Sequence, residues 1–450
     1  MTILKSMCAF YVISILTTGC NVVPQLEPPY ADTPSRWREN SQGPASEIDP
    51  QWWLTFGSSE LNRMMTQALL YNNDLAAAER RVEQARAQAK IAGANLWPAV
   101  GLVGDFSDTH NNLGDVQKKT GQLSVAYEVD LWGANRARRY AGVARLLSEV
   151  FARDALKLVV MADVGQAYFN LLAVKQRKHI STTFLNNVAE VLAIVDVRFQ
   201  AGAVSAVDVA QQQTELASAR ANVDLLTQQQ ILAENALSIL LGQAPQAIAN
   251  ELLFAEIALP GIDPQQPANL LQRRPDLGQI EMQLKAANAD IGIALAAFYP
   301  KLQLSVDALL ANPQPAGLAL AMAANLAQPL FQGGRLEGGL ADARARNAEL
   351  VEIYQQTLLI ALKEVEDAAA VRSHSQRRMR ALAEAADKAA EAYRLSQEQY
   401  RVGAIDYQTL LNTQRSLLTA QNNQVQARLD VLVALVQLYK ALGGGWQANS

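Results

Sequence analysis

The chain contains the same local pattern twice, about two hundred residues apart, and this internal duplication limits the possible folds more than any other property. The segments YEVDLWGANR (127–136) and LAQPLFQGGR (326–335) both pass through an aromatic residue and glycine to arginine. Further matched pairs keep the same order: Trp97-Pro98 with Tyr299-Pro300, RFQAGAV (198–204) with QYRVGAI (399–405), and SILLGQ (238–243) with LYKALGG (438–444). We therefore expect two structural repeats, 51–250 and 251–446.

Each repeat contains two segments that alternate apolar and polar side chains, as a strand with one apolar face does. This pattern predicts strands at 99–108, 121–131, 301–310 and 317–327. Runs of about ten residues suit a tilted strand that crosses a membrane. By composition, 316–331 could instead form an apolar helix, but the strict alternation of its counterpart and the presence of Pro329 favour the strand. Four strands cannot close a barrel, so the chain must share them with other copies.

Long helical patterns follow the strands in both repeats. The first repeat opens with a helical pattern from Trp52 to about Asn95. The later patterns cover 134–200 and 335–401, which correspond to helices of roughly 100 Å. Each ends in a tip turn, at 201–206 or 402–407, and a helix of about forty residues returns from it. Charges are distributed along these hairpins, which places them in water.

The N-terminus has the features of an exported lipoprotein. Residues 1–19 contain a short apolar run after Lys5, which is typical of a signal peptide. The sequence LTTGC at 16–20 resembles a bacterial lipobox, although Thr17 stands where leucine is usual. It implies a covalent lipid on Cys20, N-palmitoyl and S-diacylglycerol, with Asn21 favouring the outer membrane; an ordinary secretory signal is the alternative. Residues 20–50 are Pro-rich and predict an extended arm, and 447–450 form a short tail.

Composition and motifs argue against catalysis. The formal net charge of −4 offers no basic field for nucleic acid. The three histidines, His110, His179 and His374, are scattered and have no metal-ligand spacing. No phosphate loop or nucleophile elbow is present in the sequence. We therefore expect neither an enzyme nor a bound cofactor other than the lipid.

The sequence resembles the TolC-like outer-membrane factor family, in the lipoprotein branch that serves resistance-nodulation-division (RND) efflux pumps, the NodT type. The resemblance rests on 271–304, supported by AYEVDLWG (126–133), PLFQGGR (329–335) and QLYKALGGGW (437–446). It implies a mixed α and β membrane protein in which three chains complete a 12-stranded β-barrel above a periplasmic α-barrel. The implied partners are two further copies of the chain, outer-membrane lipid, a periplasmic adaptor and an inner-membrane RND transporter.

The resemblance also assigns residues at the tips. Adaptor docking is expected at Gly202, Val204, Gly403 and Ile405, although the conformation of a tight turn is by itself an adequate reason for the two glycines. Gate candidates are the residues around the second tip and one from the first: Asp208, Tyr400, Asp406, Thr409 and Asn412. Thr409 and Asn412 stand where relatives often carry acids, and Ile405 where they carry an arginine. Asp208 has an alternative role as an acid at a helix N-terminus.

The expected function is the passive outer-membrane exit channel of a tripartite pump for drugs or other small toxic compounds. An outer-membrane duct for type I protein secretion shares the fold and is one alternative. A periplasmic coiled-coil adaptor or scaffold without a pore is another. The sequence does not determine which compound is transported, because in such systems the inner-membrane partner largely selects it.

Overall fold

The computed structural model describes residues 22–25, 33–34, 36–38, 48–111, 114–249, 252–262, 273–312 and 317–446. The predicted signal peptide, Cys20, most of the arm and the 447–450 tail lie outside these residues. The chain divides into two compact units, one containing Ala78–Arg153 with Asp276–Thr357, the other containing Asp154–Pro275 with Leu358–Ser450. Each repeat contributes to both units, so the two repeats are not separate compact units.

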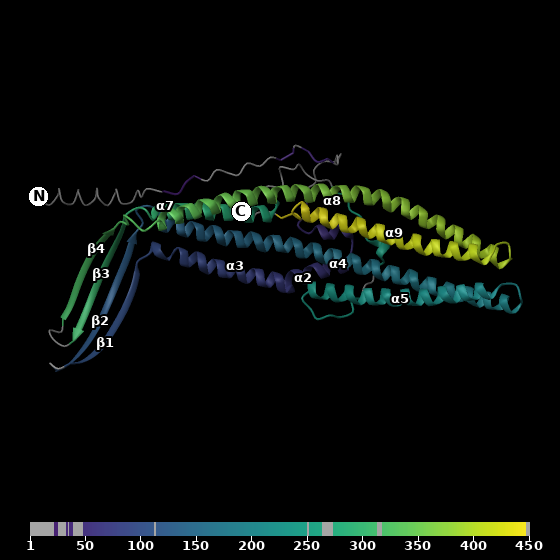
Figure 1. Ribbon diagram of the computed structural model, residues 1–450, viewed down its shortest axis with the longest axis horizontal. Helices are drawn as coiled ribbons and strands as arrows, with labels where there is room; N and C mark the ends of the chain where they lie inside the picture. The colour runs from purple at the N-terminus through teal and green to yellow at the C-terminus, as the bar shows by residue number, and fades with distance from the viewer. Residues whose placement is uncertain are drawn as a thin grey trace. The chain divides into compact units, whose positions relative to one another are not determined.

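The first unit contains a four-stranded antiparallel sheet in the order β1-β2-β3-β4 (Figure 1). The strands are β1 (Ala99–Asn111), β2 (Gly114–Val129), β3 (Lys301–Asn312) and β4 (Gly317–Ala327). The pairing of β2 with β3 joins the two repeats within one sheet. The predicted bounds of 317–327 are confirmed, whereas β1 and β3 run two or three residues further. β2 starts at Gly114 rather than at 121 and ends at Val129 rather than at 131.

The strand register keeps apolar side chains opposite one another. Tyr127 pairs with Leu304 and Val125 with Val306. On the other face Gln122 donates a hydrogen bond to Asp307 over 3.1 Å. A one-residue slip would exchange the faces, so the alternation read from the sequence also determines the register.

Small residues let the helices of the first unit approach closely. The unit contains part of α3 (Asn73–Ala92), α7 (Pro275–Ala296), and the first parts of α4 (Ala134–Gln200) and α8 (Arg335–Arg401). Ala141, Ala144, Ala286 and Ala289 form a buried cluster between α4 and α7. A Cβ atom on Gly142 would lie 2.8 Å from the Ala92 side chain, so only glycine fits this contact without movement.

The second unit is a bundle of helical hairpins. It contains the 3-10 helix η1 (Trp52–Phe56), α2 (Ser59–Tyr71), the last parts of α4 and α8, and the returning helices α5 (Ala206–Leu240) and α9 (Tyr407–Ala441). Aromatic rings fill its core: Trp52 stacks on Tyr439 with centroids 4.8 Å apart. By length and composition, α4 contains a stretch apolar enough to cross a membrane. Its side chains at Tyr168, Phe169 and Leu171 are nevertheless fully buried within this unit.

The first helical segment differs from the prediction. A continuous helix from Trp52 to about Asn95 is wrong, because the segment is divided into η1, α2, α3 and a short 3-10 helix, η2 (Ala94–Leu96). Asn72 makes the break between α2 and α3: its side-chain oxygen accepts hydrogen bonds from the backbone of Asp74 and Leu75 at 3.0 and 3.1 Å. Its amide nitrogen donates to the Leu240 carbonyl over 2.9 Å. An asparagine that caps one helix and binds another element ends the helix before it.

Candidate functional site at the hairpin tips

Both hairpins turn at their tips through the same backbone motif. After α4, Ala203 N–H donates to the Arg198 carbonyl over 2.8 Å and Gly202 N–H to Phe199 over 2.9 Å. After α8, Ala404 donates to Gln399 and Gly403 to Tyr400 in the same way. Gly202 and Gly403 have φ of 72° and 76°, in the left-handed region that glycine adopts without strain. These are Schellman motifs, so the two tips have equivalent backbone geometry.

The two acidic gate candidates cap the returning helices. Asp208 accepts hydrogen bonds from the backbone and hydroxyl of Ser205, both at 2.9 Å, and completes a capping box at the start of α5. Asp406 is the N-cap of α9 and accepts from Thr409 N–H over 2.8 Å. Hydrogen bonding from Thr409 lowers the pKa of the Asp406 carboxyl. Both carboxylates therefore have a role in helix capping, whatever else they do.

Tyr400 is buried and in contact with an arginine from the other hairpin. The Arg198 guanidinium lies over the Tyr400 ring, 4.2 Å from its centroid. One Arg198 nitrogen also donates to the Tyr400 carbonyl over 2.7 Å and to the Arg401 carbonyl over 3.2 Å. Burial raises the pKa of the Tyr400 phenol. A cation that satisfies the last carbonyls of α8 joins the end of α4 to the end of α8.

Two further contacts join the returning helices α5 and α9. The Tyr407 hydroxyl donates to Gln212 Oε1 over 2.6 Å, and the amide nitrogen of Gln212 donates to the Val188 carbonyl over 2.7 Å. Burial raises the pKa of Tyr407 to about 12, so its phenol is a neutral donor at physiological pH. Arg415 binds Glu215 through two nitrogens, Nε at 2.9 Å. Together with Arg198, these pairs hold the two hairpins of one chain together near the tips.

The remaining predicted tip residues divide by exposure. Val204 and Ile405 are half-buried and pack against the apolar tip cluster. That cluster consists of Val191, Val195, Tyr393, Tyr400, Tyr407, Leu410 and Leu411. Thr409 and Asn412 are exposed on α9, where Asn412 accepts from Gln408 over 3.2 Å. Two apolar side chains beside the turns are exposed, Val402 at 81% and Val207 at 63%.

Residue-by-residue reading of the sequence missed Arg198, Gln212, Tyr407 and the Glu215–Arg415 pair. A signal was present in the differences between the repeats. Tyr407 stands where the first repeat has Ala206, and Arg198 where the second has Gln399. In both cases a bulky polar or charged side chain that joins the hairpins occurs in only one repeat.

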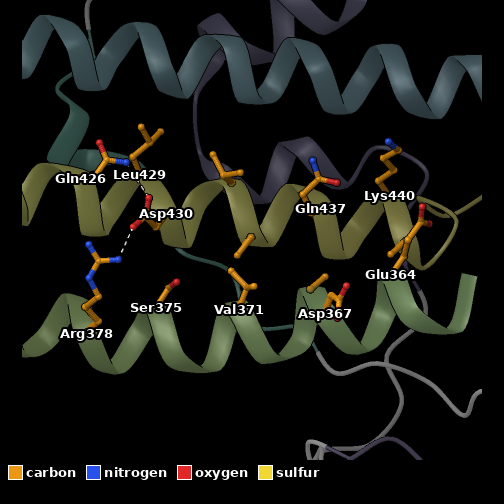
Figure 2. Close-up of a pocket in the computed structure, with 14 residues that line it drawn as sticks. Glu364, Asp367, Val371, Ser375, Arg378, Gln426, Leu429, Asp430, Gln437 and Lys440 are labelled. Carbon is orange, nitrogen blue, oxygen red and sulfur yellow. Dashed lines mark hydrogen bonds and ion pairs between the residues drawn. The ribbon is translucent and has the colours of Figure 1, made fainter. Parts of the chain in front are cut away.

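A groove of about 560 Å³ lies between α8 and α9 (Figure 2). It is lined by apolar residues, among them Val371 and Leu429, and by charged residues such as Lys440. Arg378 forms an ion pair with Asp430 at 2.9 Å, which Figure 2 shows bridging the two helices. Within the described residues, no three His, Cys, Asp or Glu side chains are grouped to hold a metal ion. The groove is therefore a feature of the α8–α9 hairpin whose lining carries both apolar and charged side chains.

Comparison with known proteins identifies the family. The sequence pattern of the family described as outer membrane efflux protein matches residues 64–243 and 267–444. The chain belongs to the outer membrane efflux protein family. It is 36% identical over 435 residues to the pyoverdine export outer membrane protein OpmQ of Pseudomonas aeruginosa, with 92% of each chain covered. It is 30% identical over 471 residues to the toluene efflux pump outer membrane protein TtgC of Pseudomonas putida, covering 98% of this chain and 96% of TtgC.

A solved structure of an outer membrane channel has the same fold as this chain. The open-state crystal structure of the Neisseria gonorrhoeae MtrE outer membrane channel matches with a TM-score of 0.87 at 25% identity, over 95% of this chain and 99% of that chain. The family resemblance, the fold class and the outer-membrane location predicted from the sequence are confirmed. This outer membrane efflux protein is a channel component of an efflux system, and its family is one of transport proteins.

Proposed function

We propose that this outer membrane efflux protein is the passive exit duct of a tripartite RND-type pump, assembled as a homotrimer. The observation that supports the proposal most directly is the open four-stranded sheet. In the described part of the chain, β1 pairs only with β2 and β4 only with β3, so each end strand has one free edge. Free edges in a membrane leave backbone groups unpaired, and three copies of four strands would close a 12-stranded barrel. Energy would come from the inner-membrane transporter.

The periplasmic partner in this proposal is an adaptor that docks at the tips. Gly202 and Gly403 leave the turn backbone open, and an added Cβ would meet nothing within 4 Å at either position. Val204 and Ile405 pack against the tip cluster and so fix the turns. The exposed Val402 and Val207 offer apolar contact area. An open backbone beside exposed apolar side chains suits a helical hairpin that packs end to end.

The gate in this proposal lies at the same tips, with Asp208, Tyr400, Asp406, Thr409 and Asn412 as its candidate residues. Thr409 and Asn412 are exposed and uncharged, so they supply no acidic ring. Introducing Thr409→Asp with Asn412→Asp would add six carboxylates to a trimeric pore. We expect stronger cation preference in single-channel recordings. Unchanged conductance and selectivity would remove these two positions from the permeation path.

The cargo is proposed to be small molecules. Relatives of this chain are named for pyoverdine export and for toluene efflux, so one channel architecture serves different compounds. The test compares cells that lack the chain with cells that carry it, the inner-membrane pump energised in both. Accumulation of fluorescent amphiphiles, secretion of pyoverdine and survival in toluene are the three readouts. We expect deletion to raise accumulation or block secretion, and complementation to reverse it.

The same strains test the alternative function. A type I protein-secretion duct would leave all three readouts unchanged and would remove specific proteins from the culture medium. That result would overturn small-molecule efflux while leaving the channel fold in place.

A further inference from the structure

An aromatic contact marks the junction between the two repeats. Trp132, three residues after β2, stacks on Tyr299, two residues before β3, with centroids 4.6 Å apart and planes at 25°. The Trp132 ring nitrogen also donates to the Pro300 carbonyl over 2.7 Å. This contact accompanies the pairing of β2 with β3, at the end where the chain passes from strand to helix. A stacked aromatic pair with a satisfied indole N–H fixes this corner.

The counterparts of these residues lie at the two ends of the sheet and are exposed. Trp97-Pro98 precedes β1 as Tyr299-Pro300 precedes β3, and Phe331 follows β4 as Trp132 follows β2. Trp97 is 75% exposed and Phe331 is 88% exposed, with Leu330 beside it at 91%. Large aromatic side chains with most of their surface in contact with solvent, at matched places in a duplicated chain, indicate a contact made with another molecule.

The duplication indicates which molecule this is. Within the chain, the second strand of one repeat pairs with the first strand of the next repeat, and their flanking aromatic residues stack. If the same pairing is repeated at the free edge of β4, the strand beside β4 is a β1 strand. A second copy of this chain supplies it. Only a second copy of this chain would form a contact equivalent to the one that Trp132 and Tyr299 already form within it.

The alternation of apolar and other side chains along β4 and β1 is compatible with pairing between these two strands of neighbouring copies. On β4, Leu320, Met322 and Leu326 are exposed and share one face, because their numbers differ by multiples of two. On β1, Val100, Leu102 and Phe106 are exposed in the same way. An antiparallel pairing that places even-numbered residues opposite one another aligns both apolar sets, as Tyr127 and Leu304 align between β2 and β3.

We propose that Phe331 of each copy stacks on Trp97 of the next copy and forms an aromatic corner between subunits, equivalent to Trp132 on Tyr299 within one chain. This rests on the homotrimer of the proposed function and specifies the residues of its interface. Phe331 has no ring N–H, so it reproduces the stack but not the hydrogen bond that Trp132 donates to the proline carbonyl. The corner between subunits is therefore the weaker of the two.

Cross-linking of the full-length chain in outer membranes tests the contact. The variant Trp97→Cys with Phe331→Cys is treated with a short bismaleimide and separated on a denaturing gel. We expect covalent dimers and trimers, whereas each single variant stays monomeric. The matched control is Val103→Cys with Phe331→Cys: Val103 is 60% exposed on the same strand but roughly 20 Å from Trp97. This control pair is expected not to cross-link.

A double-mutant cycle supplies a second measurement. Trp97→Ala and Phe331→Ala are each expected to shift the trimer toward monomer in mild detergent. Aromatic pairs imply a two- to tenfold change in the equilibrium constant per contact. The double variant should lose little more than either single variant, because both remove the same stack. Additive losses would overturn the contact.

The outcomes separate this inference from the proposed function. Trimers of normal mass that do not cross-link, or that cross-link only within one chain, would overturn the aromatic corner and leave the trimer intact. A wild-type chain that forms no trimer in the membrane would overturn the proposed homotrimer itself.

Discussion

At the scale of single residues, glycines with the same backbone conformation have different surroundings. Gly202 and Gly242 have φ of 72° and 70°. A Cβ on Gly202 would meet nothing within 4 Å, whereas on Gly242 it would lie 2.0 Å from the Tyr71 carbonyl oxygen. We expect Gly202→Ala to cost about 1 kcal/mol, from the left-handed conformation alone. Gly242→Ala must also displace backbone and should cost at least about 3 kcal/mol or prevent folding.

Thermal unfolding of both purified variants, followed by circular dichroism, measures the difference. Gly202→Ala serves as the control for Gly242→Ala, because both replace a glycine of equal φ in the same compact unit. Equal losses in the two variants would show that the approach of Tyr71 to Gly242 does not matter for stability.

At the scale of helices, the polar contacts that join the hairpins differ in burial, and the burial of each contact determines how much it stabilises the fold. Glu215 on α5 is 10% exposed and its partner Arg415 on α9 is 51% exposed. Glu398 and Arg394 pair within α8 at 2.8 Å and are both 61% exposed. Arg415→Met leaves the Glu215 carboxylate buried and unpaired, so we expect a loss of about 1 to 3 kcal/mol. Arg394→Met should cost roughly 0.5 kcal/mol or less.

Denaturant unfolding of the two variants under identical conditions tests this contrast. The companion variant Glu215→Gln removes the buried charge and should recover part of the stability when it is combined with Arg415→Met. If Arg415→Met and Arg394→Met prove equally mild, the contact between α5 and α9 does not hold the hairpins together.

At the scale of the whole molecule, the sheet and the proposed lipid are two independent attachments to the membrane. The strands present exposed apolar side chains such as Leu102, Met322 and Leu326. Cys20→Ser removes the proposed acylation site, and a leader from a non-lipoprotein keeps export intact. We expect the variant to stay in the membrane pellet after an alkaline wash, because strands in a closed barrel need no anchor. A chain released by the wash would be attached by its lipid alone, as the scaffold alternative requires.

The parts of the fold that follow a local period could be predicted from the sequence. The helices α4 and α8 begin and end at the predicted residues, and so does β4. The start of β2 was missed because the polar run around Gln117 and Lys119 has no alternation. Pairing with β1 extends the strand over this run, and from Lys119 on it also pairs with β3. The division at Asn72 was missed because an asparagine within a helical pattern gives no sign that Leu240 will accept its amide.

The candidate site was predicted only in part for the same reason. Both tip turns and their glycines were predicted, since a Schellman turn depends on neighbouring residues. Cys20 and its lipid stay a prediction. The contacts of Arg198 with Tyr400, and of Gln212 with Tyr407, join residues about two hundred positions apart.

The sequence by itself determined the duplication, the strand faces, the long hairpins and the family, because period and motif order are properties of a linear chain. Only the tertiary structure decided which side chains of one repeat meet those of the other. Trp132 meets Tyr299 and Arg198 meets Tyr400 because the repeats pair side by side. Such contacts depend on packing between distant segments, which no local pattern specifies.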